Sequence, residues 1–501
     1  MPDDPKNPRF HHLIALSLIV ITAAALRLHA LTRYSLSYDE LGTLETVAGR
    51  GQIHLTIPHN VLLSPPPRVT TERDAAPAWR IPLVMRSDVH PPLYFILLRL
   101  WLDIFGDSDA AAKMLSVVAG VLSVALIFDV GRWWHNPATG LWAALLMAVA
   151  LPQIIESRDA RPYALATLLL LAAIDALLRI QRLGNTRRRS LALGISLTAV
   201  CLTHYFVLPA VIAIGVYAPI AKQRRLLGVI AIAMALAGLL WGWGLWQQRG
   251  NFSDPWMYWM TDAGPHHIAL TLERAAALPL RFLADPMGTP ATLSIAAVIY
   301  VLPWLLCRRR PEMILTGLWL IGCVGLATAL DLFRGTQQLS WVKYTLLAAP
   351  AVYLMLASLI RGALGHLLPA AAVLFCVMNL GQAYPGREVG YTSFAYDLNR
   401  LASPKQIVVL CGSGWGAWYT GRLYMDLERY AKPMPPAVAL LNAPLPPKLL
   451  ADLADIARQT GGLWFVCWTN KPPEDLLPGW QVEKTVNYSA AVRLYELIPP
   501  Q

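Results

Sequence analysis

The sequence predicts a polytopic α-helical membrane protein of about eleven transmembrane helices that ends in a small α/β domain. Of its 501 residues, 56% are hydrophobic and 15% are charged. The hydrophobic residues are gathered in runs, several of which reach the length of about 20 residues that crosses a bilayer as a helix. From about Gly381 the composition changes, and short apolar segments alternate with polar turns as in a water-soluble domain.

The first apolar run, residues 12–31, has the length of a transmembrane helix, and no small-residue cleavage site follows it. We therefore expect a retained helix and not a signal peptide. A Pro-rich stretch, residues 32–92, is expected to form an external loop. The apolar segment 93–105 is too short to cross comfortably, so we expect it to lie in the membrane interface or to re-enter on the outer side.

Short basic runs at 187–189, 222–225 and 308–310 fix the expected topology, because such runs mark cytoplasmic loops. The formal net charge of +11 is thereby explained without a nucleic-acid partner. We expect an N-terminus in the cytoplasm, a C-terminal domain in the periplasm or outside the cell, and a location in the cell (inner) membrane. The remaining spans are expected at 110–133, 141–155, 163–180, 190–220 (out and back, turning near 203–205), 226–246, 292–307, 313–332, 344–360 and 364–378.

The predicted domains are a transmembrane domain over residues 1–380, including the loop 32–92, and an extracytoplasmic α/β domain over 381–501. Within the second domain, 406–410, 438–441 and 463–467 are expected to be short buried strands, and 449–458 has helical spacing. The glycines of GSGWG, residues 412–416, lack the spacing of a dinucleotide-binding loop, so no nucleotide cofactor is expected there.

This topology gathers ionisable residues at one membrane surface, at the outer ends of spans. Charged groups at one depth of a helical bundle more often line a cavity than face lipid, because an unpaired charge in lipid is costly. The alternative is that each is an ordinary solvated loop residue. The residues are Asp39, Glu40, Asp88, His90, Glu156, Arg158, Asp159, Arg161, His204 and Lys343.

The adjacent acids Asp39 and Glu40 have two interpretations. With Ser37 they fit a capping box, in which the serine side chain caps a helix and the side chain of Glu40, three residues later, bonds the serine N–H. Acids in the first turn also suit the helix dipole. Alternatively, the turn holds a carboxylate for catalysis, and the cap fixes it in place.

Three motifs in chain order carry a family resemblance: the acidic pair, HPPLYFILLRLWLDIFG from His90, and SRDARPYALATLLLLAAI from Ser157. Together they resemble the C-type-fold membrane glycosyltransferases of family 39, which include protein O-mannosyltransferases and bacterial aminoarabinose transferases of lipid A. The resemblance covers roughly the first 220 residues. Lys343-Tyr344 is similar to an Arg-Tyr pair in relatives. The resemblance implies transfer of a sugar from a polyprenyl-phosphate donor to an extracytoplasmic acceptor.

The implied reaction suggests a role for each candidate. An acceptor hydroxyl must lose its proton as it attacks, so Asp39 is the expected general base, with Glu40 beside it. One base without a covalent intermediate implies inversion at the anomeric carbon. The leaving lipid phosphate needs positive charge near it. The expected substrate-binding residues are His90, Glu156, Arg158, Asp159, Arg161, Tyr163, His204, Lys343 and Tyr344. The expected partners are the donor, membrane lipid, and a lipid, glycan or protein acceptor.

A divalent ion bound by His90 and Asp88 is an alternative use of those two residues. Val89 stands where relatives of the lipid A branch carry an acid, which counts against a shared metal site. Two other function classes stay open. A polytopic transporter would be expected to show internal repeats and charges at mid-membrane. A non-catalytic subunit of an envelope complex would use Asp39 only as part of a helix cap.

Overall fold

The computed structural model describes residues 8–251, 264–284, 311–359, 363–383, 392–412, 417–442, 445–468, 473–488 and 492–500. The chain divides into two compact units, which we call the helical unit (Met1–Thr32 and Met85–Pro385) and the sheet unit (Arg33–Val84 and Gly386–Gln501). The expected division assigned residues 32–92 to the membrane part. In the structure, residues 33–84 group with the C-terminal domain instead.

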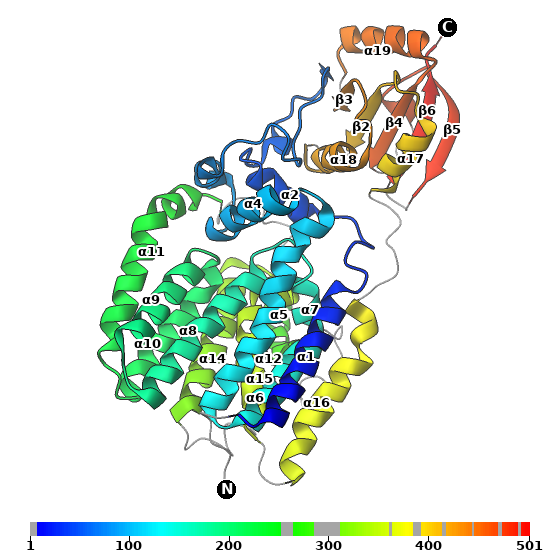
Figure 1. Ribbon diagram of the computed structural model, residues 1–501. Coiled ribbons are helices and arrows are strands. Elements are labelled where there is room, and N and C mark those ends of the chain that lie inside the picture. The colour runs from blue at the N-terminus through cyan, green and yellow to red at the C-terminus, as the bar shows by residue number, and fades with distance from the viewer. Residues whose placement is uncertain are drawn as a thin grey trace. The chain divides into compact units, whose positions relative to one another are not determined.

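The helical unit is built from long apolar helices (Figure 1). Five of the described helices are long and apolar enough to cross a membrane: α1 (Phe10–Leu28), α5 (Asp109–Trp134), α8 (Tyr163–Leu183), α11 (Leu226–Gln248) and α14 (Pro311–Arg334, of which Met313–Arg334 qualifies). The others are α4 (Leu93–Phe105), α6 (Pro137–Val149), α7 (Leu151–Glu156), α9 (Arg187–Cys201), α10 (Leu208–Ile220), α12 (His267–Arg281), α15 (Ala349–Ala357) and α16 (Leu367–Met378). The span expected at 292–307 lies outside the described residues.

Local sequence signals set several of these helix ends. Ser108 caps α5 by accepting the N–H of Ala111, and Asn136 caps α6 in the same way, with proline as the first helical residue. Gly184 ends α8 with a φ of 85°, a backbone conformation that favours glycine. The juxtamembrane segment expected at 93–105 is helix α4 with those same bounds, preceded by Pro92 and followed by Gly106.

The span expected at 141–155 is divided into α6 and α7, and Pro152 explains the break. Proline has no N–H to donate to the carbonyl four residues earlier, which is that of Ala148. Arg27 of α1 fills the vacancy, donating from Nη1 to Ala148 O at 3.1 Å and from Nη2 to Met147 O at 3.1 Å. The N–H of Leu151 turns away and bonds Leu283 O. This fully buried arginine therefore holds the α6–α7 junction.

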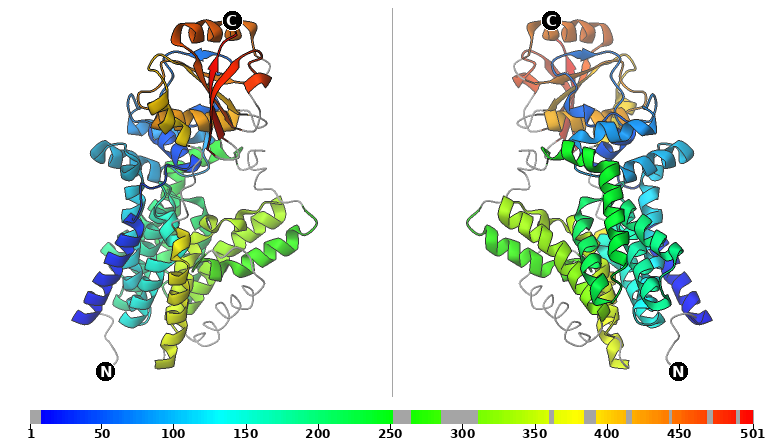
Figure 2. Two further views of the ribbon diagram at one scale, coloured as in Figure 1. Left: turned by 90° about the vertical axis from the view of Figure 1, so that its right-hand side faces the viewer. Right: turned by 90° about the vertical axis from the view of Figure 1, so that its left-hand side faces the viewer.

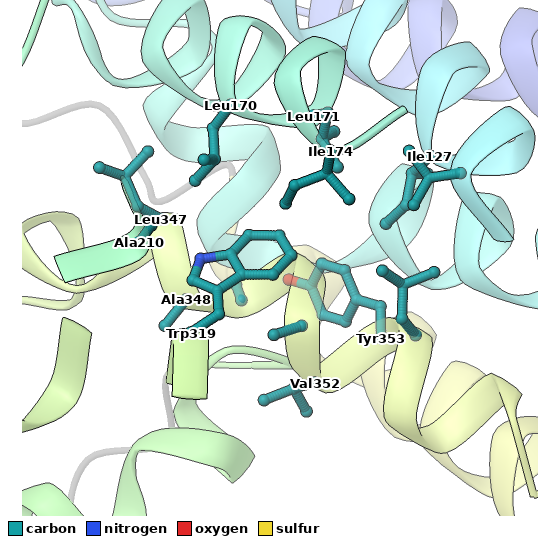
Figure 3. Packing of buried hydrophobic residues seen from close by; sticks show 14 of the residues in the cluster. Ile127, Leu170, Leu171, Ile174, Ala210, Trp319, Leu347, Ala348, Val352 and Tyr353 are labelled. Atoms are coloured by element: carbon teal, nitrogen blue, oxygen red, sulfur yellow. The ribbon is translucent and has the colours of Figure 1, made fainter. Parts of the chain in front are cut away.

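The main core of the helical unit is a large apolar cluster that draws on helices from α1 to α16. Figure 3 shows Trp319 of α14 and Tyr353 of α15 side by side, facing Leu170 and Ile174 of α8. The tyrosine hydroxyl donates to Phe282 O at 2.7 Å, just after α12. Residues 267–281, which lie between the spans expected at 226–246 and 292–307, form a helix whose end packs into this core.

The sheet unit contains α2 (Tyr38–Val47), α3 (Ile81–Val84), α17 (Ser393–Leu401), α18 (Ala417–Tyr430) and α19 (Pro447–Thr460) with one six-stranded sheet. Its strand order is β1-β3-β2-β4-β6-β5, and Figure 2 shows the strands from two further sides. The strands are β1 (Leu62–Leu63), β2 (Val408–Gly412), β3 (Val438–Leu441), β4 (Leu463–Trp468), β5 (Gln481–Asn487) and β6 (Val492–Ile498).

The three expected strands form the parallel centre of this sheet, in the order β3-β2-β4. Their side chains alternate between two faces: Val409 and Phe465 pack with α19, and α18 contacts β2 and β4. Strand β1, from the segment before α4, pairs antiparallel with β3, with Leu63 opposite Val438. The N-terminal segment thus completes one edge of the C-terminal sheet.

Candidate active site

The turn after α7 carries three of the expected site residues, Arg158, Asp159 and Arg161, and Arg158 anchors it. The Arg158 guanidinium is buried and donates to three main-chain carbonyls: His29 O at 3.1 Å, Ala30 O at 3.0 Å and Ala383 O at 2.9 Å. The first two lie just beyond the end of α1. Arg27 of α1 bonds the end of α6, and Arg158 bonds the residues after α1. Two arginines therefore link α1 to the α6–α7 segment and the turn that follows it. Arg158, expected at the substrate phosphate, is engaged with the backbone.

A second group of side chains meets near the start of α4, and we call it the His90 cluster: Asp88, His90, Arg161, Tyr163 and His204. His90 Nδ1 lies 2.8 Å from Asp88 Oδ1, which also accepts the N–H groups of Val89 at 2.6 Å and His90 at 3.0 Å. An imidazole that donates from Nδ1 presents an acceptor at Nε2. Arg161 Nη2 lies 3.4 Å from that nitrogen. The cluster therefore brings together residues from separate motifs, as expected.

The carboxyl of Asp88 is held in its charged form. Burial raises its pKa, but the hydrogen bond from His90, the charge of Arg161 and the N–H of Val89 outweigh that effect. The net result is a pKa below the ordinary aspartate value. The one carboxylate among the five defining residues of the cluster is thus already paired with His90.

His204, in the turn between α9 and α10, contacts three other rings in edge-on or tilted arrangements. Its ring centroid is 5.4 Å from that of His90, 5.1 Å from Tyr163 and 5.6 Å from Phe206. Nδ1 accepts the N–H of Phe206 at 3.2 Å, so the neutral ring carries its proton on Nε2. Among the described residues, that buried nitrogen has no hydrogen-bond partner. Burial, His90 and Arg161 hold the pKa of His204 well below its ordinary value.

A layer of polar residues that sequence reasoning missed fixes the main chain of the cluster. Gln248, fully buried at the end of α11, donates to Met85 O at 2.7 Å and to His90 O at 3.1 Å. Its own oxygen accepts from Tyr205 at 2.6 Å. Asn251 donates to the carbonyl of Asp88 at 2.9 Å. The available signal was the polar QQRGN sequence, which directly follows an apolar span.

The remaining expected residues of the helical unit are Lys343, Tyr344, Glu156 and Asp159. Lys343 Nζ lies 5.6 Å from the ring centroid of Trp341 and 5.5 Å from that of Tyr344. Tyr344 in turn stacks at 5.8 Å on Phe206, which neighbours His204. Glu156 is the last residue of α7, and the carbonyl of Asp159 accepts the Arg161 N–H at 2.7 Å.

In the sheet unit, the structure separates the two adjacent acids by their surroundings. Ser37 Oγ accepts the Glu40 N–H at 3.3 Å, and Glu40 Oε2 accepts the Ser37 N–H at 2.8 Å, which completes the expected capping box at the start of α2. Glu40 is buried, whereas Asp39 is exposed. The cap interpretation therefore holds for Glu40, and it leaves Asp39 at the surface of the first helical turn.

The metal alternative finds little support in this donor set. One oxygen of Asp88 already accepts three N–H groups, and His90 Nδ1 faces it as a donor and not as a ligand. Within the described ranges, no group of three or more His, Cys, Asp or Glu residues could hold a metal ion. Asp88 and His90 as arranged do not fit a divalent ion.

Comparison with known proteins adds family and fold. Residues 89–246 match the family model described as dolichyl-phosphate-mannose-protein mannosyltransferase. Two crystal structures of ArnT from Cupriavidus metallidurans are similar in fold: the undecaprenyl-phosphate complex at 12% identity and TM-score 0.58, and the apo state at 13% and 0.57. Each match covers 97% of this chain and 99% of the ArnT chain.

An oligosaccharyltransferase of Archaeoglobus fulgidus, crystallised with zinc and sulfate, is similar at 14% identity and TM-score 0.50. That match covers 90% of this chain and 67% of the archaeal one. The search of curated proteins finds no match. The family model covers four of the five residues of the His90 cluster, all except Asp88, and the ArnT-like fold spans nearly the whole chain. The expected resemblance is confirmed to this extent: residues 89–246 match the protein-mannosyltransferase family model, and the chain has the fold of ArnT.

Proposed function

We propose that this protein is a membrane glycosyltransferase that moves a sugar from a polyprenyl-phosphate donor to a lipid, glycan or protein acceptor outside the cytoplasm, with inversion at the anomeric carbon. The observation that carries the proposal is the His90 cluster. Its one carboxylate is paired with His90, while Arg161 supplies positive charge and His204 a buried N–H. A phosphate oxygen is the kind of acceptor that such groups bind.

In the proposed reaction, Asp39 takes the proton of the acceptor hydroxyl as its oxygen bonds to the anomeric carbon. The bond from that carbon to the phosphate oxygen breaks, and its electron pair stays on the lipid phosphate. Arg161, His90, Tyr163, His204, Lys343 and Tyr344 are the proposed groups that stabilise this leaving group and orient the sugar. Glu156 and Asp159 are proposed to bind sugar hydroxyls.

Asp39 is favoured over Glu40 as the base because the two carboxylates differ in burial and in their role in the helix cap. Glu40 is buried and bonded in the cap of α2, so it is poorly placed to receive a substrate proton. Asp39 is exposed on the rigid first turn of the same helix. A base fixed on a capped helix suits a reaction that depends on geometry.

The proposed setting is the cell (inner) membrane, with about eleven spans, the N-terminus in the cytoplasm and the C-terminal domain outside. Five long and four shorter apolar helices among the described residues support a polytopic arrangement. Helix α4 keeps large apolar side chains exposed, among them Ile104 at 74% and Phe105 at 57%. These support contact with membrane lipid at the interface.

The reaction class is tested in proteoliposomes with a panel of radiolabelled polyprenyl-phosphate sugars and membrane extract as acceptor. Wild type should transfer label from at least one donor, and the anomeric configuration of the product, determined by NMR, should be opposite to that of the donor. Asp39→Asn is the matched control, because the amide preserves the shape of the turn and removes the base. Product with retained configuration would contradict the single-base mechanism, and no transfer from any donor would count against the proposed donor class.

A further inference from the structure

We propose that helix α18 of the C-terminal domain sets the position of Asp39, with Arg422 and Tyr430 as positioning residues for sugar transfer. The inference rests on the proposed role of Asp39 as the base, and it gives the C-terminal domain a part in catalysis. All the contacts involved lie within the sheet unit.

The first contact holds the backbone three residues before Asp39. The N–H of Leu36 donates to Tyr430 Oη at 2.8 Å, and the carbonyl of Leu36 accepts from Arg422 Nη2 at 3.1 Å. Both polar main-chain atoms of this buried residue are thus bonded to side chains of α18. We call these two bonds the Leu36 clamp. Since Ser37 follows directly and caps α2, the Leu36 clamp fixes where the helix that carries Asp39 begins.

The second contact holds the residue next to Asp39. Tyr38 Oη lies 2.7 Å from His54 Nε2, and His54 Nδ1 lies 2.5 Å from Glu45 Oε2. His54 rests against α18 at Gly421, where a Cβ atom would come within 2.9 Å of its ring and 3.0 Å of its carbonyl oxygen. Only a glycine lets the helix approach this closely. The Tyr38 side chain is therefore bonded to a histidine that packs against α18 at Gly421.

Arg422, which donates to Leu36, is itself oriented by another residue of α18. Asp426 Oδ2 accepts from Arg422 Nε at 2.7 Å, which orients the guanidinium so that Nη2 reaches Leu36 O. Elsewhere on the helix, Glu428 accepts from the hydroxyl of Thr70 at 2.5 Å, and Tyr424 donates to Pro67 O at 2.5 Å. These two bonds hold residues 67 and 70, which are remote in sequence from Asp39.

Position matters here because a general base must lie within hydrogen-bond reach of the proton it removes. A displacement of about 1 Å at such a group can lower the rate roughly a hundredfold. Loss of one of the two bonds to Leu36 should move Asp39 by less, so we expect a smaller effect on kcat and little effect on donor binding.

The test compares two Tyr→Phe changes on the same helix. Tyr430→Phe removes the acceptor of the Leu36 N–H, whereas Tyr424→Phe removes an equivalent hydroxyl bonded to Pro67, far along the chain from Asp39. We expect Tyr430→Phe to lower kcat about tenfold with the donor KM unchanged, and Tyr424→Phe to leave kcat within about twofold. Arg422→Lys should retain more of kcat than Arg422→Met, since lysine can still donate to Leu36 O.

Thermal unfolding of each variant shows whether the compared proteins are folded. Equal kcat for the two Tyr→Phe variants, both folded, would overturn the positioning role. Asp39→Asn in the same series keeps the two proposals distinguishable. If Asp39→Asn is inactive while Tyr430→Phe matches wild type, positioning by α18 fails and the base stands; if Asp39→Asn is fully active, the proposed base itself fails.

Discussion

The two ends of α8 carry polar clusters of opposite design. Near its start is the His90 cluster. Near its end is an ion-pair cluster of Asp129 and Arg132 from α5 with Asp175 and Arg179 from α8. Here Asp129 accepts from both arginines, Arg179 Nε donates to Asp175 at 2.6 Å, and both guanidinium groups pack on the Trp133 ring. Two arginines are thus paired with two aspartates.

The difference separates the ion-pair cluster, which links two helices, from the proposed substrate site. In the ion-pair cluster the charges balance, so nothing is left for a ligand to neutralise. In the His90 cluster the single carboxylate is paired with His90, and the buried N–H of His204 has no acceptor among the described residues. A buried donor is costly unless an acceptor arrives, and a substrate phosphate would supply one.

The largest effect expected from the contrast between the two clusters is on the rate of sugar transfer. Arg161→Met should lower the transfer rate about 100-fold or more, because in the proposed reaction this charge stabilises the leaving phosphate. The same change at Arg158 is the control, because that guanidinium bonds main-chain carbonyls. We expect Arg158→Met to lower the Tm and to leave the rate of the folded fraction within a few fold. Similar rate losses in both variants would remove the distinction between the two arginines.

The next effect concerns the opposite end of α8. Asp129→Asn should lower the free energy of unfolding by about 2 kcal/mol, less than the roughly 3–5 kcal/mol for breaking fully buried pairs, because Arg179 is 36% exposed. Transfer per folded molecule should stay near wild type. Thermal unfolding in detergent and the transfer assay measure the two quantities. A lost rate with an unchanged Tm would make this cluster functional and not structural.

The smallest effect is a pH dependence of stability. The pKa of His204 lies well below its ordinary value in the folded protein, so between those two values only the unfolded chain binds the proton. Stability is therefore full above about pH 6.5 and falls on acidification, by at most about 1.4 kcal/mol per pH unit. His204→Asn keeps an acceptor for the Phe206 N–H but cannot titrate, so its Tm should fall less between pH 7 and 5. Identical slopes would contradict the buried neutral histidine.

Much of the fold could be predicted because its signals are local. The bounds of α4 follow from an apolar run between proline and glycine, and the central strands follow from short buried runs. Strand β1 could not be predicted: only two residues pair with Val438 and Ala439, and such a pairing depends on tertiary contacts. The break at Pro152 had a local signal, but its partner Arg27 did not.

The candidate site was predictable to a similar degree. The order of motifs identified the residues that meet in the His90 cluster, since span ends on one side of a bundle converge. Sequence could not separate Arg158 from Arg161, or Asp39 from Glu40, because each pair has the same chemistry within a few positions. Burial and hydrogen bonding separate them. Gln248 was missed because a lone amide at a helix end is common.

The most direct measurement of the central claim compares Asp39→Asn with Glu40→Gln in the proteoliposome assay, with both variants matched for Tm. The proposed general base predicts that Asp39→Asn lowers kcat by about 100-fold or more. Glu40→Gln should stay within a few fold of wild type, because the glutamine oxygen can still accept the Ser37 N–H. The reverse ranking, or two equal and small losses, would contradict Asp39 as the catalytic base.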